Sequence, residues 1–234
     1  MGCFFIAFYK NQHYNISYHL KGRVFLGKKY ITIIFDDGPR EPLCEMVDKF
    51  NKYGFKGGFA VYGKNISDAT EHMLRYAVDN GFTLISHSQT HCHLEDLTER
   101  QDVIDELMTP IKEVKNRIGY TMTMARFPYN KYNDTTLDVA KELNLALLGN
   151  GMNCGADSRP ETTPQTIITN TLNSVCDGAI ACMHVTPNTC NALDTILPEL
   201  KSRGYEAVTP EELFKIKGIT NIPLGIYINN VNDI

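Results

Sequence analysis

The chain has 234 residues, and 23 Lys and Arg against 27 Asp and Glu give a formal net charge of −4 at pH 7. This acidic balance lacks the basic face that nucleic-acid binders usually need, so we expect no nucleic-acid partner. Apolar residues make up 43% of the sequence and charged residues 21%, which is typical of a globular chain and excludes wholesale disorder. No apolar run approaches the roughly 20 residues of a membrane helix, so no membrane span is predicted.

Strand and helix patterns alternate along most of the chain. The first is the run Ile31–Phe35, almost entirely β-branched or aromatic, which predicts a strand buried on both faces of a parallel sheet. The elements then expected are a helix over 43–50, a strand at 58–61, a helix capped by Ser67, a strand at 82–85, a long helix opened by a capping box of Thr98 and Gln101, a strand at 122–127, a helix at 136–143, a strand at 145–148, a helix at 164–175, a strand at 179–183, a helix ended by Gly204, a strand at 205–208 and a helix starting at Thr209 and Pro210.

About seven strand–helix units predict an α/β fold, a single deformed (β/α) barrel with about seven parallel strands. We expect an N-terminal segment over 1–29, the barrel over 30–217 and an irregular C-terminal tail over 218–234, in a monomeric protein. In such barrels the active site lies at the carboxyl ends of the strands. The polar residues directly after each strand are therefore the candidates for function.

Two adjacent carboxylates, Asp36 and Asp37, follow the first strand. Their side chains leave an extended backbone in opposite directions and can have different roles. Taken alone, Asp-Asp-Gly-Pro is more typical of a surface turn, because all three residue types favour turns.

Two histidines, His87 and His91, follow the third strand. Their spacing of four residues would place both imidazoles on one face of a helical turn, close enough to bind one metal ion. A chance pair of surface histidines is an equal alternative. Cys92 and His93 could also ligate a metal, but Cys92 would point elsewhere on such a helix, so His87 with His91 is the better pair.

Single polar residues follow three later strands: Arg126, Asp157 and His184. Taken alone, Arg126 is more simply explained as a solvated arginine before a turn, and His184 as a hydrogen-bonded histidine near the core. Together with the earlier groups they offer a metal site with an open position, a second carboxylate, an arginine that could orient it and a further histidine. That combination is typical of a hydrolase.

The order of these motifs resembles that of a known family. Ile34-Phe35-Asp36-Asp37-Gly38-Pro39 resembles the signature Thr-Phe-Asp-Asp-Gly-Pro, His87-Ser88-Gln89-Thr90-His91 matches His-Ser/Thr-x-x-His, Arg126-Phe127-Pro128-Tyr129 matches Arg-x-Pro-Tyr, and Met183-His184 stands at Leu-x-His. Over about residues 30–215 the chain is therefore similar to the NodB-homology polysaccharide deacetylases, carbohydrate esterase family four, which include chitin and peptidoglycan deacetylases.

The resemblance implies a metal site and a catalytic base. Asp37, His87 and His91 would bind a divalent metal, most often Zn²⁺ with Co²⁺ as the alternative, which polarises the acetamide carbonyl and a water molecule. Asp36 would be the general base that takes a proton from that water. Arg126 would orient Asp36 and keep it ionised, because a close positive charge lowers the pKa of a carboxyl group. No organic cofactor is implied.

The resemblance also implies an acid and an oxyanion donor. The backbone N–H of Tyr129 would help to stabilise the oxyanion, and His184 would protonate the leaving amine. Asp157 matches an aspartate of the fourth family motif, which would support Arg126.

The departures from the family pattern fall on the substrate side. The fourth motif, Asp-x-x-Asp-Trp in the family, reads Cys154 to Ser158 here and lacks both the first Asp and the Trp, and the chain contains no Trp at all. Loss of a large apolar ring beside a sugar subsite should change which sugar fits. Asn130 stands where Gly is common, Cys182 replaces an aliphatic residue, and Val185 replaces a frequent Asp.

The resemblance predicts a metal-dependent N-deacetylase that acts on N-acetylglucosamine units of chitin or a related cell-wall polysaccharide. The alternatives are a catalytically weak or inactive wall or coat protein of the same fold and an amidase on a smaller, non-carbohydrate N-acyl substrate. Sequons at Asn15, Asn65 and Asn133 would suit a secreted or cell-surface protein, although the N-terminus has no charged leader.

Overall fold

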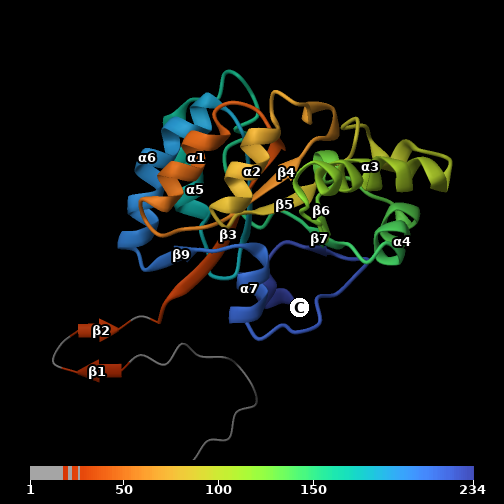
Figure 1. Ribbon diagram of the computed structural model, residues 1–234. Helices are drawn as coiled ribbons and strands as arrows, with labels where there is room; N and C mark the ends of the chain where they lie inside the picture. The colour runs from red at the N-terminus through yellow and green to blue at the C-terminus, as the bar shows by residue number, and fades with distance from the viewer. Residues whose placement is uncertain (1–17, 21–22, 26) are drawn as a thin grey trace, which may run out of the picture.

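Figure 1 shows a computed structural model of the chain, in which residues 18–20, 23–25 and 27–234 are described. Strands β1 (Tyr18–Leu20) and β2 (Arg23–Phe25) pair antiparallel in a sheet of their own. Most of the expected N-terminal segment, including the Asn15 sequon, lies outside the described residues. No described helix is both long and apolar enough to cross a membrane.

The central sheet is parallel throughout, in the strand order β10-β7-β6-β5-β4-β3-β8 with β9 pairing beside β3. Its strands are β3 (Lys29–Gly38), β4 (Gly58–Val61), β5 (Thr83–Ser86), β6 (Met124–Ala125), β7 (Ala146–Leu148), β8 (Ile180–His184), β9 (Tyr205–Ala207) and β10 (Tyr227–Ile228). The two end strands approach each other, because the N–H of Ile180 donates to the Asn229 carbonyl and Ala179 bridges Asn230. The predicted deformed (β/α) barrel is confirmed.

Figure 1 shows helices along the outside of this sheet and one helix, α7 (Pro210–Ile216), on its other side, where Leu213 and Phe214 join the apolar cluster of the barrel interior. The other helices are α1 (Leu43–Asn51), α2 (Glu71–Asp79), α3 (Arg100–Ile118), α4 (Asp134–Glu142), α5 (Pro164–Ser174) and α6 (Pro187–Ser202), with short 3₁₀ turns η1 (Gly63–Asn65), η2 (Leu94–Asp96), η3 (Pro128–Asn130) and η4 (Val231–Asp233). One apolar cluster fills the layer between sheet and helices and contains the packed rings of Phe35, Phe50, Phe59 and Phe82. A smaller cluster, with Ile34 and Ile228, fills the barrel interior.

The predicted helix starts are right at one place and wrong at two. α7 begins at Thr209 and Pro210 as expected, and a capping box marks its start: the Thr209 side chain accepts from the Glu212 N–H, and the Glu212 side chain accepts from the Thr209 N–H. Ser67 does not cap α2, because its N–H donates to Thr70 in a turn that precedes the helix. The predicted box of Thr98 and Gln101 is also wrong, since the cap of α3 is Glu99, without a side-chain bond.

The expectation of an irregular tail over 218–234 is wrong for its second half. Strand β10 pairs with β7 there, and the following residues bridge to the start of β8. A two-residue strand is too short to show an alternating pattern, so no periodicity marks it in the sequence. The C-terminal residues thereby complete the barrel.

We expect Ile228→Ala to destabilise the protein by about 3 kcal/mol, as is usual when a buried isoleucine is truncated in a packed core. Ile228 is 1% exposed, whereas Ile226, two residues earlier, is 44% exposed. Ile226→Ala is the matched control and should change the free energy of unfolding by about 0.5 kcal/mol or less. Urea denaturation of both variants measures the difference, and equal losses would contradict a structural role for β10.

Candidate active site

The candidate residues meet at the carboxyl edge of the sheet. Asp36 lies at the end of β3 and pairs in register with His184 at the end of β8. His87 and Arg126 directly follow the neighbouring strands β5 and β6. The expectation that polar residues after successive strands would lie together therefore holds for these four.

The two adjacent aspartates point to different surroundings because the end of β3 is irregular. The register of β3 against β4 shifts between Phe35 and Gly38, and Asp37 has a left-handed backbone with φ of 68°. The side chain of Asn65 donates to the Asp37 carbonyl over 2.9 Å and holds this conformation. A left-handed backbone is uncommon outside glycine and is tolerated best by Asn and Asp. Asp36 is consequently buried below the edge, while Asp37 faces the histidines.

Asp37, His87 and His91 form a group that fits a metal ion. Oδ1 of Asp37 lies 3.4 Å from Nε2 of His91 and 3.7 Å from Nε2 of His87. One ligand atom from each residue lies within 4.8 Å of the other two. Oδ1 of Asp37 is buried and has no hydrogen-bond partner among the described residues. A buried, unpartnered carboxylate oxygen facing two imidazole nitrogens matches the donor set of a catalytic zinc-type site.

The two histidines come together for a different reason from the one predicted. Residues 87–93 form a loop and not a helical turn, and both Ser88 and His91 have left-handed backbones. The loop is anchored by Glu106 of α3, whose Oε2 accepts from the N–H groups of Gln89 and Thr90. His93, the alternative ligand, pairs with Glu95 and lies outside the group.

His87 is held as a neutral ligand. Its Nδ1 lies 2.6 Å from the Arg126 carbonyl, so Nδ1 carries the proton and the lone pair of Nε2 faces Asp37. Burial lowers the pKa of His87 and outweighs the nearby carboxylates of Asp36 and Asp37, which raise it. A neutral imidazole is the form that binds a metal.

Asp36 is an ionised carboxylate with one oxygen left free. Its Oδ2 accepts from Nε of Arg126 over 2.7 Å and from the Cys182 thiol over 3.1 Å, while Oδ1 is buried without a partner among the described residues. Burial would raise its pKa, but the charge and the hydrogen bond of Arg126, with a contribution from His184, outweigh burial and lower the pKa to about 2. Asp36 is therefore oriented and charged, as a general base requires.

Arg126 is fully buried by its partners. Besides Asp36, its guanidinium donates to the Leu148 carbonyl at 3.2 Å, to the Gly149 carbonyl and to Oδ1 of Asn130 at 3.0 Å. Asn130, where the family commonly has glycine, is thus part of the support for this arginine. The sequence assigns no role to Asn130 or Cys182. The contact of Asn130 with Arg126 depends on a local loop conformation, and the contact of Cys182 with Asp36 joins two strands that are distant in the sequence.

The predicted partner of Asp157 is wrong. Asp157 supports His184: its Oδ1 lies 2.9 Å from Nδ1 of His184, and its Oδ2 accepts from the His184 N–H and from the Thr189 hydroxyl, both over 2.7 Å. Arg126 finds its partners in β3, in the loop after β7 and in η3 instead. The bond at Nδ1 leaves Nε2 of His184 as the atom directed toward a substrate.

Asp157→Asn is expected to move the alkaline limb of kcat/KM to lower pH and to reduce kcat/KM at pH 8 at least about tenfold. Burial opposes the charged imidazolium, but the bond to Asp157 and the charges of Asp36, Asp157 and Asp37 outweigh it and raise the pKa of His184. The pH dependence of kcat/KM in the wild type and the variant measures the shift. Asp194→Asn, at an aspartate whose side chain is 64% exposed, is the control and should leave the profile unchanged.

The same substitution should alter stability in a defined pH range. A raised pKa stabilises the folded state below the ordinary pKa of histidine, near 6.5, and that stabilisation is lost as the pH rises through the folded value. The variant should therefore lose more unfolding free energy at pH 5.5 than at pH 9. An equal loss at both values would contradict the pairing.

Tyr129 lies beside the metal group, which is the set of Asp37, His87 and His91. Its backbone is left-handed, with φ of 60°, and so is that of Asn130. The ring stacks on His93 with centroids 4.0 Å apart, and its hydroxyl lies 3.2 Å from Nδ1 of His91. A non-glycine residue held in this conformation is typical of a functional loop. A cavity of about 400 Å³ lies beside it, lined by Asp37, Arg40, Tyr62, Asn65, Thr90, His91 and Tyr129.

Comparison with known proteins gives consistent matches. A family profile described as "Polysaccharide deacetylase" matches residues 24–148. A bifunctional xylanase/deacetylase of Pseudobutyrivibrio xylanivorans is 29% identical over 86% of this chain and 33% of its own length. A peptidoglycan-N-acetylglucosamine deacetylase of Listeria monocytogenes is 29% identical over 80% of this chain and 39% of its own. This chain therefore spans only a third to two fifths of these curated relatives.

Among solved structures, a family 4 acetyl xylan esterase from Clostridium thermocellum in complex with a cobalt ion superposes with a TM-score of 0.79 and 30% identity. The match covers 87% of this chain and 99% of that one. A similar protein with this fold thus holds a divalent metal.

Proposed function

Because the chain belongs to the polysaccharide deacetylase family, we propose that it is a metal-dependent hydrolase that removes acetyl groups from a polysaccharide. The observation that carries the proposal is Oδ1 of Asp37, which faces His87 and His91 and has no hydrogen-bond partner within the described part of the chain. A charged Asp36 and the supported His184 lie at the same edge. Family membership alone would not require these side chains to be arranged for hydrolysis.

Each of these residues has a separate proposed role in hydrolysis. Asp37, His87 and His91 would hold a divalent metal, which would supply Lewis acidity to the acetyl carbonyl. Asp36 accepts a proton from the attacking water at its free Oδ1, while Arg126 keeps it charged and oriented. His184 donates a proton from Nε2 to the leaving group, with Asp157 stabilising the imidazolium.

The remaining assignments complete the proposal. The backbone N–H of Tyr129 contributes to oxyanion stabilisation, supported by the fixed loop conformation at this residue. Zinc is the proposed metal, because an aspartate and two histidines suit zinc in a site that keeps a position open. Cell-wall polysaccharides lie outside the cell membrane, so the proposal includes export of the protein.

The proposed substrate is an N-acetylglucosamine unit of chitin or a related cell-wall polymer. The Listeria relative is named for N-acetylglucosamine in peptidoglycan, which supports this sugar unit without selecting chitin. Acetylated xylan is a second candidate, favoured by two xylan-associated relatives. An ester needs the same base and the same acid as an amide, so the arrangement of Asp36 and His184 suits both.

The test is acetate release by zinc-loaded protein from three substrates: N-acetylglucosamine oligomers, peptidoglycan fragments and acetylated xylo-oligosaccharides. Each assay is repeated after chelation and after zinc is restored, with bound metal measured throughout. Zinc-dependent release from any substrate supports the function and identifies the polymer. Stoichiometric zinc with oligomer binding but no release would favour the inactive wall or coat protein. Release confined to small non-carbohydrate N-acyl compounds would favour the amidase.

A further inference from the structure

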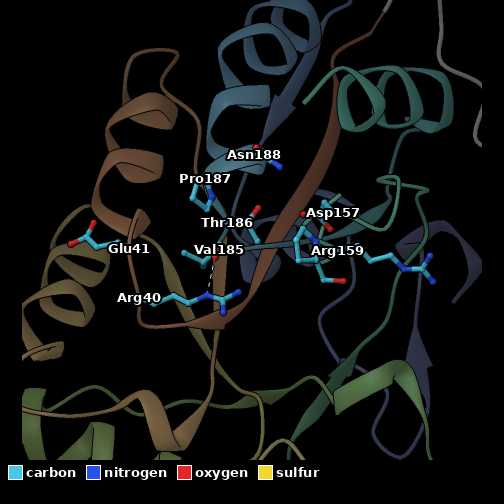
Figure 2. A pocket seen from close by; sticks show the side chains of 10 residues that line it. Arg40, Glu41, Asp157, Arg159, Val185, Thr186, Pro187 and Asn188 are labelled. Carbon is cyan, nitrogen blue, oxygen red and sulfur yellow. Dashed lines mark hydrogen bonds between the residues drawn. The ribbon is translucent and has the colours of Figure 1, made fainter. Parts of the chain in front are cut away.

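A second cavity, of about 440 Å³, adjoins the catalytic edge on the side of the altered fourth motif. Residues 157–160 and 185–188 form its walls, and Arg40 lies beneath Val185 (Figure 2). Arg40 also lines the cavity beside the metal group, so the two cavities meet at this residue. A substituent in the second cavity would therefore belong to a sugar close to the one whose acetyl group is cleaved.

Most residues that line the second cavity are polar. Ser158, in the altered fourth motif, contributes a hydroxymethyl group, and Thr186 and Asn188 contribute a hydroxyl and an amide. A polar substituent of the substrate therefore suits this cavity better than an apolar one.

Arg40 is the fixed cation of this cavity. Its Nε donates to the Val185 carbonyl over 2.8 Å, and its Nη2 lies 3.4 Å from Oδ2 of Asp37. These contacts hold the guanidinium, whose side chain is still 43% exposed. A pre-positioned guanidinium loses little conformational entropy when it binds an anion.

Some N–H groups of Arg40 bond neither Val185 nor Asp37 and remain available to an entering group. Asp37 contacts one end of the guanidinium, and both oxygens of Asp157 are bonded to His184 and Thr189. Figure 2 shows the Glu41 carboxylate and the Arg159 guanidinium extending away from the cavity on opposite sides. Arg40 is therefore the cationic donor that an entering anion would meet in this cavity.

Building on the proposed function, we propose that this cavity is a subsite for a carboxylate-bearing substituent of the polysaccharide and that Arg40 binds the carboxylate. The planar guanidinium fork matches a carboxylate in geometry and charge. The substrate class is thus an acidic acetylated polysaccharide. The carboxylate can come from a uronic acid branch, as on xylan, or from the lactyl ether of muramic acid in peptidoglycan.

The test compares each acidic substrate with its own carboxyl methyl ester, which keeps the shape and removes the charge. Acetylated oligosaccharides with a uronic acid branch form one pair, and muramic-acid-containing peptidoglycan fragments form the other. Wild-type protein should show kcat/KM about tenfold higher for the acid than for the ester in at least one pair, the effect of one exposed charge-assisted hydrogen bond. The pair that shows the preference identifies the source of the carboxylate.

Arg40→Gln should reduce this preference to within about twofold, and Arg40→Lys should keep part of it because the charge remains without the fork. Arg159→Gln, which removes a cation from the same wall, should keep the full preference. Since acid and ester are compared within one variant, any effect of Arg40 on metal binding through Asp37 cancels in the ratio. Bound metal is measured in every sample.

Equal rates for acid and ester in the wild type, or an unchanged preference in Arg40→Gln, would overturn the subsite. If no acetate is released from any substrate, the proposed function fails, and calorimetric binding of the same pairs to the zinc-loaded protein still decides the inference. Tighter binding of the acid that depends on Arg40 would support the subsite, and equal binding of acid and ester would reject it.

Discussion

Asp36→Asn is expected to lower kcat for acetate release about 10³-fold, within the range contributed by a positioned general base. The amide keeps the shape of the carboxylate but cannot accept a proton from water at the position of Oδ1. Because Asp36 lies outside the Asp37–His87–His91 group, bound metal should stay stoichiometric. Acetate release and metal content are measured on the same samples. Loss of activity together with loss of metal would contradict the separate role of Asp36.

The same variant should also be less stable. The Arg126 side chain is 1% exposed and would lose its anionic partner, and leaving a buried charge unpaired typically costs about 3–5 kcal/mol. The carbonyls of Leu148 and Gly149 still accept from Arg126, which favours the lower end of that range. Asp68→Asn, at a side chain that is 99% exposed, is the control for removing a carboxylate. Urea denaturation of Asp36→Asn and Asp68→Asn compares their free energies of unfolding.

His87→Ala is expected to weaken zinc binding by more than about 100-fold, since even loss of an outer-sphere partner can weaken a metal site by 10- to 100-fold. Acetate release should fall in parallel, because Asp37 and His91 alone leave the ion with too few ligands to orient a substrate. Metal content after dialysis and a zinc titration measure the affinity. His93→Ala removes a histidine of the same loop outside the metal group and should keep the metal. Equal zinc loss in both variants would contradict the assigned ligands.

The sequence predicted which residues meet, because barrel topology decides that. Asp36 and His184 lie at the ends of strands, His87 and Arg126 directly follow strands, and parallel strands bring such positions to one edge whatever the loops do. It did not predict how they meet. His87 and His91 converge through a loop fixed by Glu106, a residue 15 positions beyond His91 whose role requires the packing of α3 against the loop.

Pairings between side chains were harder to predict than positions. The resemblance implies that Asp157 supports Arg126, whereas in the structure Asp157 is bonded to His184. The sequence does not separate the two partners, because a carboxylate after one strand can reach basic groups on either side. Only the strand order and the local twist decide between them. The hydrogen bond from the Cys182 thiol to Asp36 is equally hard to predict, since a cysteine in an apolar strand is usually a core residue.

The contacts made by residues near position 229 affect when the site can form during translation. The Phe127 N–H donates to the Tyr227 hydroxyl, and the Asn229 side chain accepts from the Asn150 N–H beside the arginine-binding carbonyls. Domains generally fold from the N-terminus as they emerge during translation. Here the loop next to Arg126 acquires its last contacts only when residues near 229 have left the exit tunnel. The nascent chain therefore carries an unfinished candidate active site until this strand has left the tunnel.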